Sequence, residues 1–307
     1  MKRKCFTLVE LLVVIAIIAL LMGILVPALA RARALAHRMV CGSNLSGIGK
    51  AMILYANENQ EEFPRAGGPD ATWASIGRLN TPAWKRATST PAKVFGSPPK
   101  ATITSCLWLL VRGRGTGKDS YATTKQFVCK GDRDAIIFGL SKLVKMGRPD
   151  SIFDCWDFGG DRGLYPGDCC SYSYQMPFGM TEFRPNRAPD LINFCIDETS
   201  SEASPVCADR NPYLDLNVNI DPLTHGGNSA AHWWRGQNVL YKDLHADFAN
   251  DPCVGIGSDN IYTFGGDPAT GGGDPVGTPP SGTGQIEAGE HQQGEKDAFL
   301  VNEKQSP

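Results

Sequence analysis

An apolar segment near the amino terminus constrains this chain more than any other feature. Residues 11–29 contain no charged side chain, and a basic leader, residues 1–5, precedes them. A helix of about 20 apolar residues is long enough to cross the hydrocarbon core of a bilayer. One carboxylate, Glu10, stands at the start of the run. Because an ionised group in a membrane segment is costly, we expect this carboxylate to have a partner.

The residues around Glu10 form a motif. Phe6-Thr7-Leu8-Val9-Glu10 lies between the basic leader and the apolar run. This arrangement resembles the N-terminus of type IV pilins and of the pseudopilins of type II secretion systems. The resemblance implies cleavage between Cys5 and Phe6 by a prepilin peptidase, N-methylation of Phe6, and a role for Glu10 as the charge that guides assembly. The family usually has Gly where this chain has Cys5.

Simpler interpretations of the N-terminus explain less of it. A secretory signal peptide has a shorter apolar core that ends at small residues near the cut. A signal anchor needs only a basic flank and an apolar run, so it leaves the Phe-Thr-Leu-Val-Glu motif unexplained. A lipoprotein signal would place its Cys after the apolar region, whereas Cys5 precedes it. We therefore prefer the pilin-like interpretation.

Charge and flanking residues indicate where the chain resides. The net charge is only −2, so no general attraction to nucleic acid is expected. Three basic residues at positions 2–4 favour a cytoplasmic N-terminus, although three arginines between residues 31 and 38 reduce the asymmetry. The resemblance implies a single-pass inner-membrane protein with an exported domain, periplasmic or extracellular after assembly. Its implied partners are the peptidase, other pilin or pseudopilin subunits and the inner membrane.

The apolar run continues into an amphipathic segment. Residues 31–60 keep a helical spacing of apolar side chains, weakened at Gly42, Gly47 and Gly49, and the helix is expected to end within residues 57–64. Pro27 is expected to kink it. We predict five parts: leader 1–5, transmembrane helix 6–30, helical continuation 31–60, exported globular domain 61–264, and disordered tail 265–307, which is poor in apolar residues. The resemblance implies an α+β fold, with the long helix packed on an antiparallel sheet.

Several short segments of the domain have strand-like patterns. Residues 171–174 alternate like a strand, and residues 191–197 have the composition of a buried strand. Residues 237–249 predict a hairpin with strands at 238–241 and 245–248. Residues 103–112 are apolar and fit either a short helix or a strand.

The chain has 10 cysteines, nine of them in the part placed outside the cytoplasm. Disulfides persist in such compartments, so we predict at least one disulfide among the cysteines from Cys106 to Cys253. The pairing does not follow from the sequence. No C-x-x-C pair is present, so neither a zinc ribbon nor a thioredoxin-like centre is expected.

A second motif lies in the predicted hairpin. His232, Asp243, Leu244 and His245 resemble the H-x9-D-G pattern at the end of a large group of bacterial pilin-like proteins, and residues 127–132 resemble the Cys-Pro-x-Asp of the same group. Here the His-to-Asp spacing is one residue longer and Leu244 replaces Gly. Because Leu is poor at positive φ, we expect the turn to have shifted or changed type.

The same residues have two chemical interpretations. Asp243, His245 and Asp247 would share one strand face, with His225 and His232 nearby in sequence, and such groups can bind a divalent metal. We prefer a polar, solvated hairpin face, and therefore predict no metal site. Trp233 and Trp234 are expected to belong partly to the core.

No motif predicts catalysis or a required cofactor. The chain lacks G-x-S-x-G and H-E-x-x-H, so we expect no catalytic residue and no enzyme activity. Asp251, Asp259, Asp267 and Asp274 alternate with Gly, and some pseudopilins bind calcium in a C-terminal loop, but the spacing matches no recognised calcium loop. The function predicted is a structural subunit of a type IV pilus or pseudopilus. The alternative is a membrane-anchored binding module or enzyme that uses only the pilin-type export signal.

Overall fold

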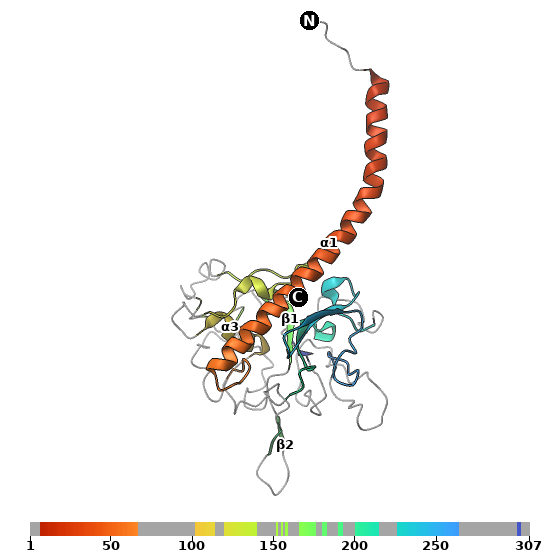
Figure 1. The fold of residues 1–307 in the computed structure, drawn as a ribbon. Helices are drawn as coiled ribbons and strands as arrows, with labels where there is room; N and C mark the ends of the chain where they lie inside the picture. Colours follow the sequence, from red (N-terminus) through yellow and green to blue (C-terminus); the bar gives the residue numbers. More distant parts are fainter. Residues whose placement is uncertain are drawn as a thin grey trace.

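The fold is α+β, as the sequence predicts. The computed structural model describes residues 7–66, 102–113, 120–139, 152, 155, 157–158, 166–175, 180–182, 190–192, 200–214, 226–263 and 300–301. Within these residues a long N-terminal helix protrudes from a domain and packs at its other end on an antiparallel sheet (Figure 1). The predicted leader, with Cys5, and the predicted mature N-terminus, Phe6, lie outside the described residues.

The N-terminal helix α1 runs without interruption from Leu8 to Glu58 and ends where the sequence predicts. Pro27 lies inside it, and the helix follows a curved course (Figure 1). Burial begins only at Cys41 and then recurs at Leu45, Ile48 and Met52, the spacing of one helix face. The same helix thus has an exposed first half and a second half that belongs to the domain core.

The glycines in the second half of α1, Gly42, Gly47 and Gly49, lie on the face that packs against the domain. A side chain on Gly49 would meet Leu240 at 3.1 Å, and one on Gly47 would meet the amide of Gln126 at 2.8 Å. The helix remains continuous through these three positions. Their cost in helix propensity is therefore offset by close packing of α1 against the elements beneath it.

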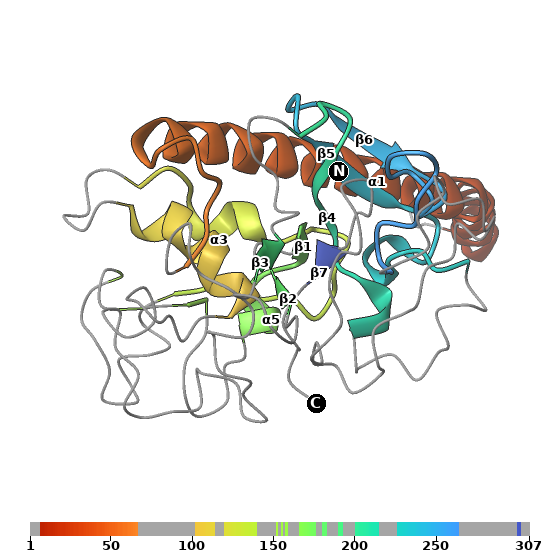
Figure 2. The same ribbon diagram turned by 90° about the horizontal axis from the view of Figure 1, so that it is seen from below.

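The main sheet has five antiparallel strands in the order β6-β5-β4-β1-β7. The strands are β1 (Tyr172–Gln175), β4 (Pro205–Asp209), β5 (Gln237–Tyr241), β6 (Ala246–Ala249) and β7 (Leu300–Val301). A separate pair consists of β2 (Met180–Glu182) and β3 (Asp190–Ile192). The second half of α1 lies along β5 and β6 (Figure 2).

Short helices complete the described part of the domain. They are α3 (Ile103–Arg112), η2 (Thr124–Phe127), α5 (Pro166–Cys169), η4 (Pro212–Leu214) and η6 (Ala230–His232). Residues 103–112 are thus helical, which resolves the helix-or-strand alternative. Thr102 begins α3 with a capping box that includes Ser105.

The strand predictions are confirmed in part. β1 covers the predicted strand at 171–174 shifted by one residue, and β5 with β6 forms the predicted hairpin. Of the predicted strand 191–197, only residues up to 192 are described, in β3. The prediction of a disordered tail is wrong at Leu300–Val301, because β7 pairs with β1 and the Leu300 side chain is fully buried.

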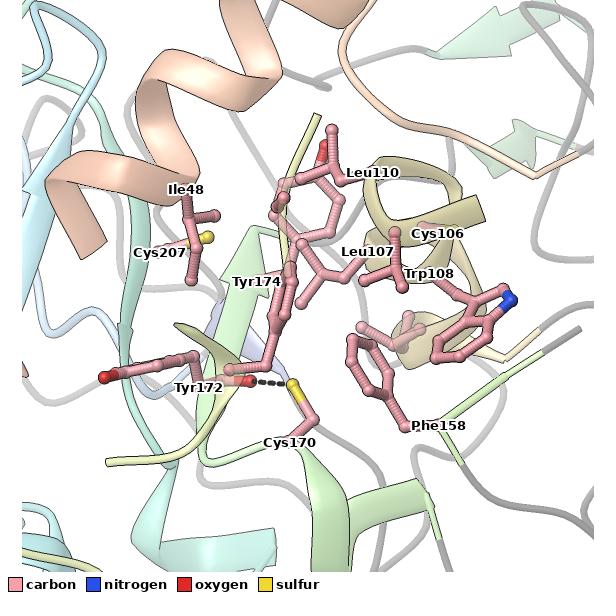
Figure 3. Close-up of a cluster of buried hydrophobic side chains, with 14 of the residues drawn as sticks. Ile48, Cys106, Leu107, Trp108, Leu110, Phe158, Cys170, Tyr172, Tyr174 and Cys207 are labelled. Atoms are coloured by element: carbon pink, nitrogen blue, oxygen red, sulfur yellow. Dashed lines mark hydrogen bonds between the residues drawn. The ribbon is translucent and has the colours of Figure 1, made fainter. Parts of the chain in front are cut away.

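The core lies between α1, α3 and β1 (Figure 3). Trp108 of α3 packs edge-on against Phe158 and Phe138, with ring centroids 4.9 and 4.8 Å apart. Its indole N–H donates to the carbonyl oxygen of Cys155 at 3.0 Å. Ile48 brings α1 into this cluster, so the core fixes the second half of the long helix and leaves the first half free to project.

Candidate functional site

The start of α1 is capped by the acidic residue of its first turn, Glu10. The backbone N–H and the hydroxyl of Thr7 each donate to Oε2 of Glu10 at 2.8 Å, and the Glu10 N–H donates to the Thr7 hydroxyl at 3.3 Å. This capping box satisfies donors that a helix start otherwise leaves without partners. The carboxylate is therefore held at the N-terminal end of the helix, against Thr7, which follows Phe6 in the sequence.

The first half of α1 exposes an apolar surface. Its large apolar side chains from Leu8 to Leu29 are 44–78 % exposed. In the described part of the chain α1 is the one helix long and apolar enough to cross a membrane, and its most apolar window is not buried in the domain. A continuous surface of this size is unfavourable in water. Lipid or the apolar helices of other proteins must cover it.

Basic side chains follow the apolar half where α1 reaches the domain. The guanidinium of Arg38 lies 4.0 Å from the ring centroid of Phe248 in β6, a cation–π geometry. This contact joins the helix to the edge strand of the sheet, just before the buried face begins at Cys41. The protruding half thus starts from a defined anchor on the domain.

Comparison with known proteins finds a family match that covers most of the protruding half of α1. Residues 1–26 match the family model described as the prokaryotic N-terminal methylation motif. The match spans the leader, the predicted cut and most of the apolar run. It supports a pilin-type prepilin signal, which implies processing by a prepilin peptidase, and with the apolar helix it fits a membrane-anchored protein. No curated protein and no solved structure matches the chain.

The turn between β5 and β6 differs from the expectation. Leu244 itself adopts positive φ, +72°, so the left-handed position is kept where we expected a shifted or altered turn. The N–H of Leu244 donates to the carbonyl oxygen of Tyr241 at 2.9 Å. Its side chain lies 3.2 Å from where a Cβ on Gly49 would stand. Packing on α1 therefore offsets the strain of a left-handed Leu.

The polar residues of the turn face solvent. Asp243 and His245 are exposed, His245 stacks on Tyr241 at 4.4 Å, and its Nε2 lies 3.9 Å from Asp247. A hydrogen bond from the backbone N–H of His245, together with the contact between the two side chains, holds the pKa of Asp243 below its ordinary value. The fourth residue of the motif, His232, does not join them and is buried elsewhere.

Trp233 contradicts the prediction that it contributes to the core. It is 62 % exposed, and the guanidinium of Arg133 lies 3.9 Å from its ring. It also has positive φ, +62°, directly after η6. This reversal of the chain turns the Trp233 ring outward while His232 points inward. Trp234 is half-buried.

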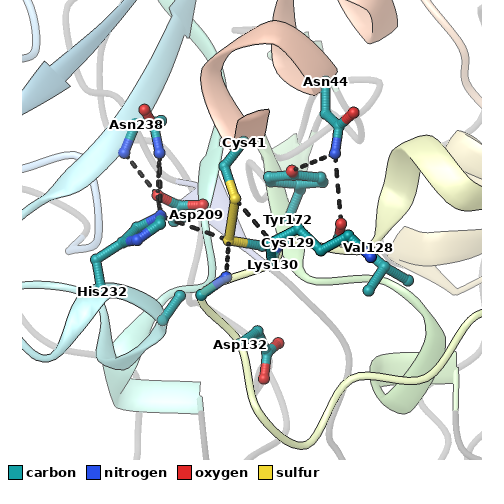
Figure 4. Close-up of a disulfide and its surroundings, with 12 residues drawn as sticks. Cys41, Asn44, Val128, Cys129, Lys130, Asp132, Tyr172, Asp209, His232 and Asn238 are labelled. Atoms are coloured by element: carbon teal, nitrogen blue, oxygen red, sulfur yellow. Dashed lines mark hydrogen bonds and ion pairs between the residues drawn. A yellow bond between two sulfur atoms is a disulfide. The ribbon is translucent and has the colours of Figure 1, made fainter. Parts of the chain in front are cut away.

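A disulfide joins α1 to the loop after η2 (Figure 4). It links Cys41 with Cys129, whose Cα atoms are 5.2 Å apart. A disulfide is thus present, but the prediction of one within the interval 106–253 is wrong for the described cysteines, because only Cys129 of this pair lies in that interval. Other described cysteines keep their thiols, and burial raises the pKa of Cys170 to about 12. Such a thiol is unreactive at neutral pH.

Two further side chains surround the disulfide. His232 Nε2 lies 3.4 Å from Cys129 Sγ and 3.2 Å from Asp209 Oδ2. Sequence reasoning singled out Cys129 and His232 in separate motifs but missed Cys41 as their partner and gave Asp209 no role. The shared resemblance of the two motifs to one protein group was the available signal that they meet.

The acidic positions considered for calcium are described only in part. Asp267 and Asp274 lie outside the described residues. The Asp251 carboxylate accepts from the N–H of Cys253 at 2.7 Å, and Asp259 is buried. Calcium binding in this region stays the untested alternative to the solvated linker that the sequence favours.

Proposed function

We propose that this chain is a structural subunit of a type IV pilus or of a type II secretion pseudopilus. The observation that carries the proposal is the exposed apolar half of α1, which begins at the Thr7–Glu10 cap and lies mostly within the methylation motif. A peptidase removes residues 1–5, and the new Phe6 amine is methylated. The apolar helices then bundle into a filament, and the domains, exported across the inner membrane, face outward.

Glu10 sets the register of the bundle. An unpaired amine or carboxylate is expensive in an apolar bundle, whereas a pair is tolerated. Both bonds from Thr7 end on Oε2 of Glu10, so Oε1 is available to the Phe6 amine of a neighbouring subunit. The role proposed is one of assembly rather than of catalysis.

Processing is the first test. The protein is purified from membranes of cells with and without a prepilin peptidase, and its N-terminus is determined by mass spectrometry. We expect residues 1–5 to be absent and Phe6 to carry one methyl group when the peptidase is present. Cys5→Gly should be processed faster than the wild type. An intact Met1 in the presence of active peptidase would contradict the proposal.

Assembly is the second test, with a variant that separates charge from capping. Glu10→Leu removes both, whereas Glu10→Gln keeps a hydrogen-bond acceptor for Thr7 and removes only the charge. Both variants should insert and fold, and neither should form filaments that can be sheared and sedimented. Filaments from Glu10→Gln at the wild-type level would rule out charge pairing. Filaments from Glu10→Leu at that level would exclude pilin-type assembly and favour the anchored binding module.

A further inference from the structure

Four potential metal ligands meet around the disulfide. They are the sulfurs of Cys41 and Cys129, the carboxylate of Asp209 and the imidazole of His232, and their ligand atoms all lie within 4.8 Å of one another. All four residues are buried. They come from α1, the loop after η2, the end of β4 and the end of η6 (Figure 4). In a tetrahedral zinc site, bonds of about 2.0–2.3 Å place neighbouring ligand atoms about 3–4 Å apart.

Hydrogen bonds around the sulfurs suit thiolates better than a disulfide. The N–H of Lys130 donates to Cys41 Sγ at 3.2 Å, and the N–H of Gly131 donates to Cys129 Sγ at 3.3 Å. A neutral sulfur is a weak acceptor, whereas a bond to an anionic acceptor is about twice as strong as a neutral one. Two backbone donors thus face the two atoms that would carry negative charge.

The carboxylate of Asp209 is oriented from one side only. The N–H and the Nδ2 of Asn238 donate to its Oδ2 at 2.6 and 3.0 Å. The other oxygen, Oδ1, is buried and has no hydrogen-bond partner among the described residues. A buried carboxylate oxygen without a partner is costly, and coordination to a cation would remove that cost.

We propose that the dithiol form of this chain binds one Zn²⁺ through Cys41, Cys129, Asp209 and His232. Two thiolates and an imidazole favour a borderline-soft divalent ion over calcium or magnesium, which take oxygen ligands. Binding to two thiols releases two protons, one from each sulfur. Asn238 orients Asp209 as an outer partner. The inference goes beyond the proposed function and does not depend on it.

The metal form and the disulfide form exclude each other, because the disulfide has no thiolate to coordinate. The disulfide cross-links α1 to the loop that holds Cys129, and the ion would in addition join both to the ends of β4 and η6 through Asp209 and His232. The ion would hold α1 and this loop together where thiols stay reduced, and the disulfide would hold them together where thiols are oxidised. α1 and the loop that holds Cys129 are thus joined in both kinds of compartment.

The test uses the full chain in detergent, reduced with a phosphine and stripped of metal with a chelator that is then removed. His37, Arg38 and Arg235 line the hollow beside His232, and their basic side chains oppose cation entry, so samples are equilibrated with metal before measurement. Co²⁺ serves as the probe, since it gives visible ligand-field bands and a thiolate-to-cobalt band. We expect one Co²⁺ per reduced chain, displaced by Zn²⁺, and none in the chain that keeps its disulfide.

Variants locate the site. Cys41→Ser with Cys129→Ser should abolish the thiolate-to-cobalt band, and Cys207→Ser with Cys253→Ser should retain it. The variant His232→Gln can be purified with its disulfide intact, so that its folding is verified before reduction. After reduction, this variant should bind Co²⁺ at least about tenfold more weakly than the wild type. The absence of the band in reduced wild type overturns the proposal. So does a band that survives loss of Cys41 and Cys129, or wild-type affinity in His232→Gln.

Discussion

Reduction of the Cys41–Cys129 disulfide should destabilise the domain strongly. The bond closes a loop with a sequence separation of 88 residues. Loop-closure entropy for that length corresponds to about 4–5 kcal/mol at 25 °C. Native proteins of this size are stable by only about 5–15 kcal/mol, so the bond accounts for a large share of the total. In a domain of about 200 residues the loss corresponds to a melting temperature lower by about 8–20 °C.

The assay is equilibrium unfolding in urea, followed by tryptophan fluorescence with and without a phosphine reductant. Trp108 is fully buried in the core, so its exposure to water on unfolding should change the fluorescence. A chelator is present in every sample, so that no metal replaces the disulfide. The matched control is Cys41→Ala with Cys129→Ala, on which the reductant should have no effect.

The reasoning fails if the reductant changes the wild-type free energy of unfolding by less than about 1 kcal/mol, well below the expected range. It also fails if the control variant responds to the reductant as strongly as the wild type. In the second case another disulfide would carry the stabilisation. A full effect in the wild type and none in the control would show that this bond secures α1 to the domain.

Three further predictions concern packing and charge. A Cβ on Gly131 would overlap the carbonyl oxygen of Ala231, so Gly131→Ala should lower the free energy of unfolding by about 1–3 kcal/mol; an unchanged urea midpoint would contradict this. Gly49→Val should cost a similar amount, because it meets Leu240 and Leu244 at a tight contact with α1, whereas Gly23→Val, in the exposed half, should leave domain unfolding unchanged. Burial alone would raise the pKa of Asp132, but its 2.9 Å ion pair with Arg210 holds that pKa below its ordinary value. The ion pair therefore contributes its full stabilisation above about pH 4, and this stabilisation is lost as pH falls through the lower pKa of Asp132 in the folded protein. Arg210→Ala should lower the free energy of unfolding by about 3–5 kcal/mol at neutral pH. In urea titrations at several pH values, the variant should no longer lose stability as Asp132 is protonated. The same acid-dependent loss in variant and wild type would contradict this prediction.

Local patterns in the sequence determine much of the architecture. The twenty uncharged residues between Glu10 and Arg31 permit a membrane-length helix, and Thr7 with Glu10 forms its cap. The strands near residues 172, 238 and 246 also follow from alternation over a few residues. These features depend on side chains within one or two turns of each other, or on neighbouring strands of one hairpin, so they are readable without the tertiary fold.

Long-range placement decides the rest. The left-handed Leu244 depends on packing against Gly49, and β7 depends on Leu300 finding a buried position beside β1. Neither follows from local propensity, which argues against a left-handed Leu and against order in a polar tail.

The residues around the disulfide show most clearly which features follow from local sequence and which depend on the tertiary fold. Local sequence pattern predicts the helix that carries Cys41 and places Cys129 and His232 in two recognisable motifs. Only the tertiary structure brought them to one buried point beside Asp209. Contacts between residues 88 or more positions apart depend on how the whole chain closes around its core, and hydrophobic period and turn chemistry carry no information about that closure.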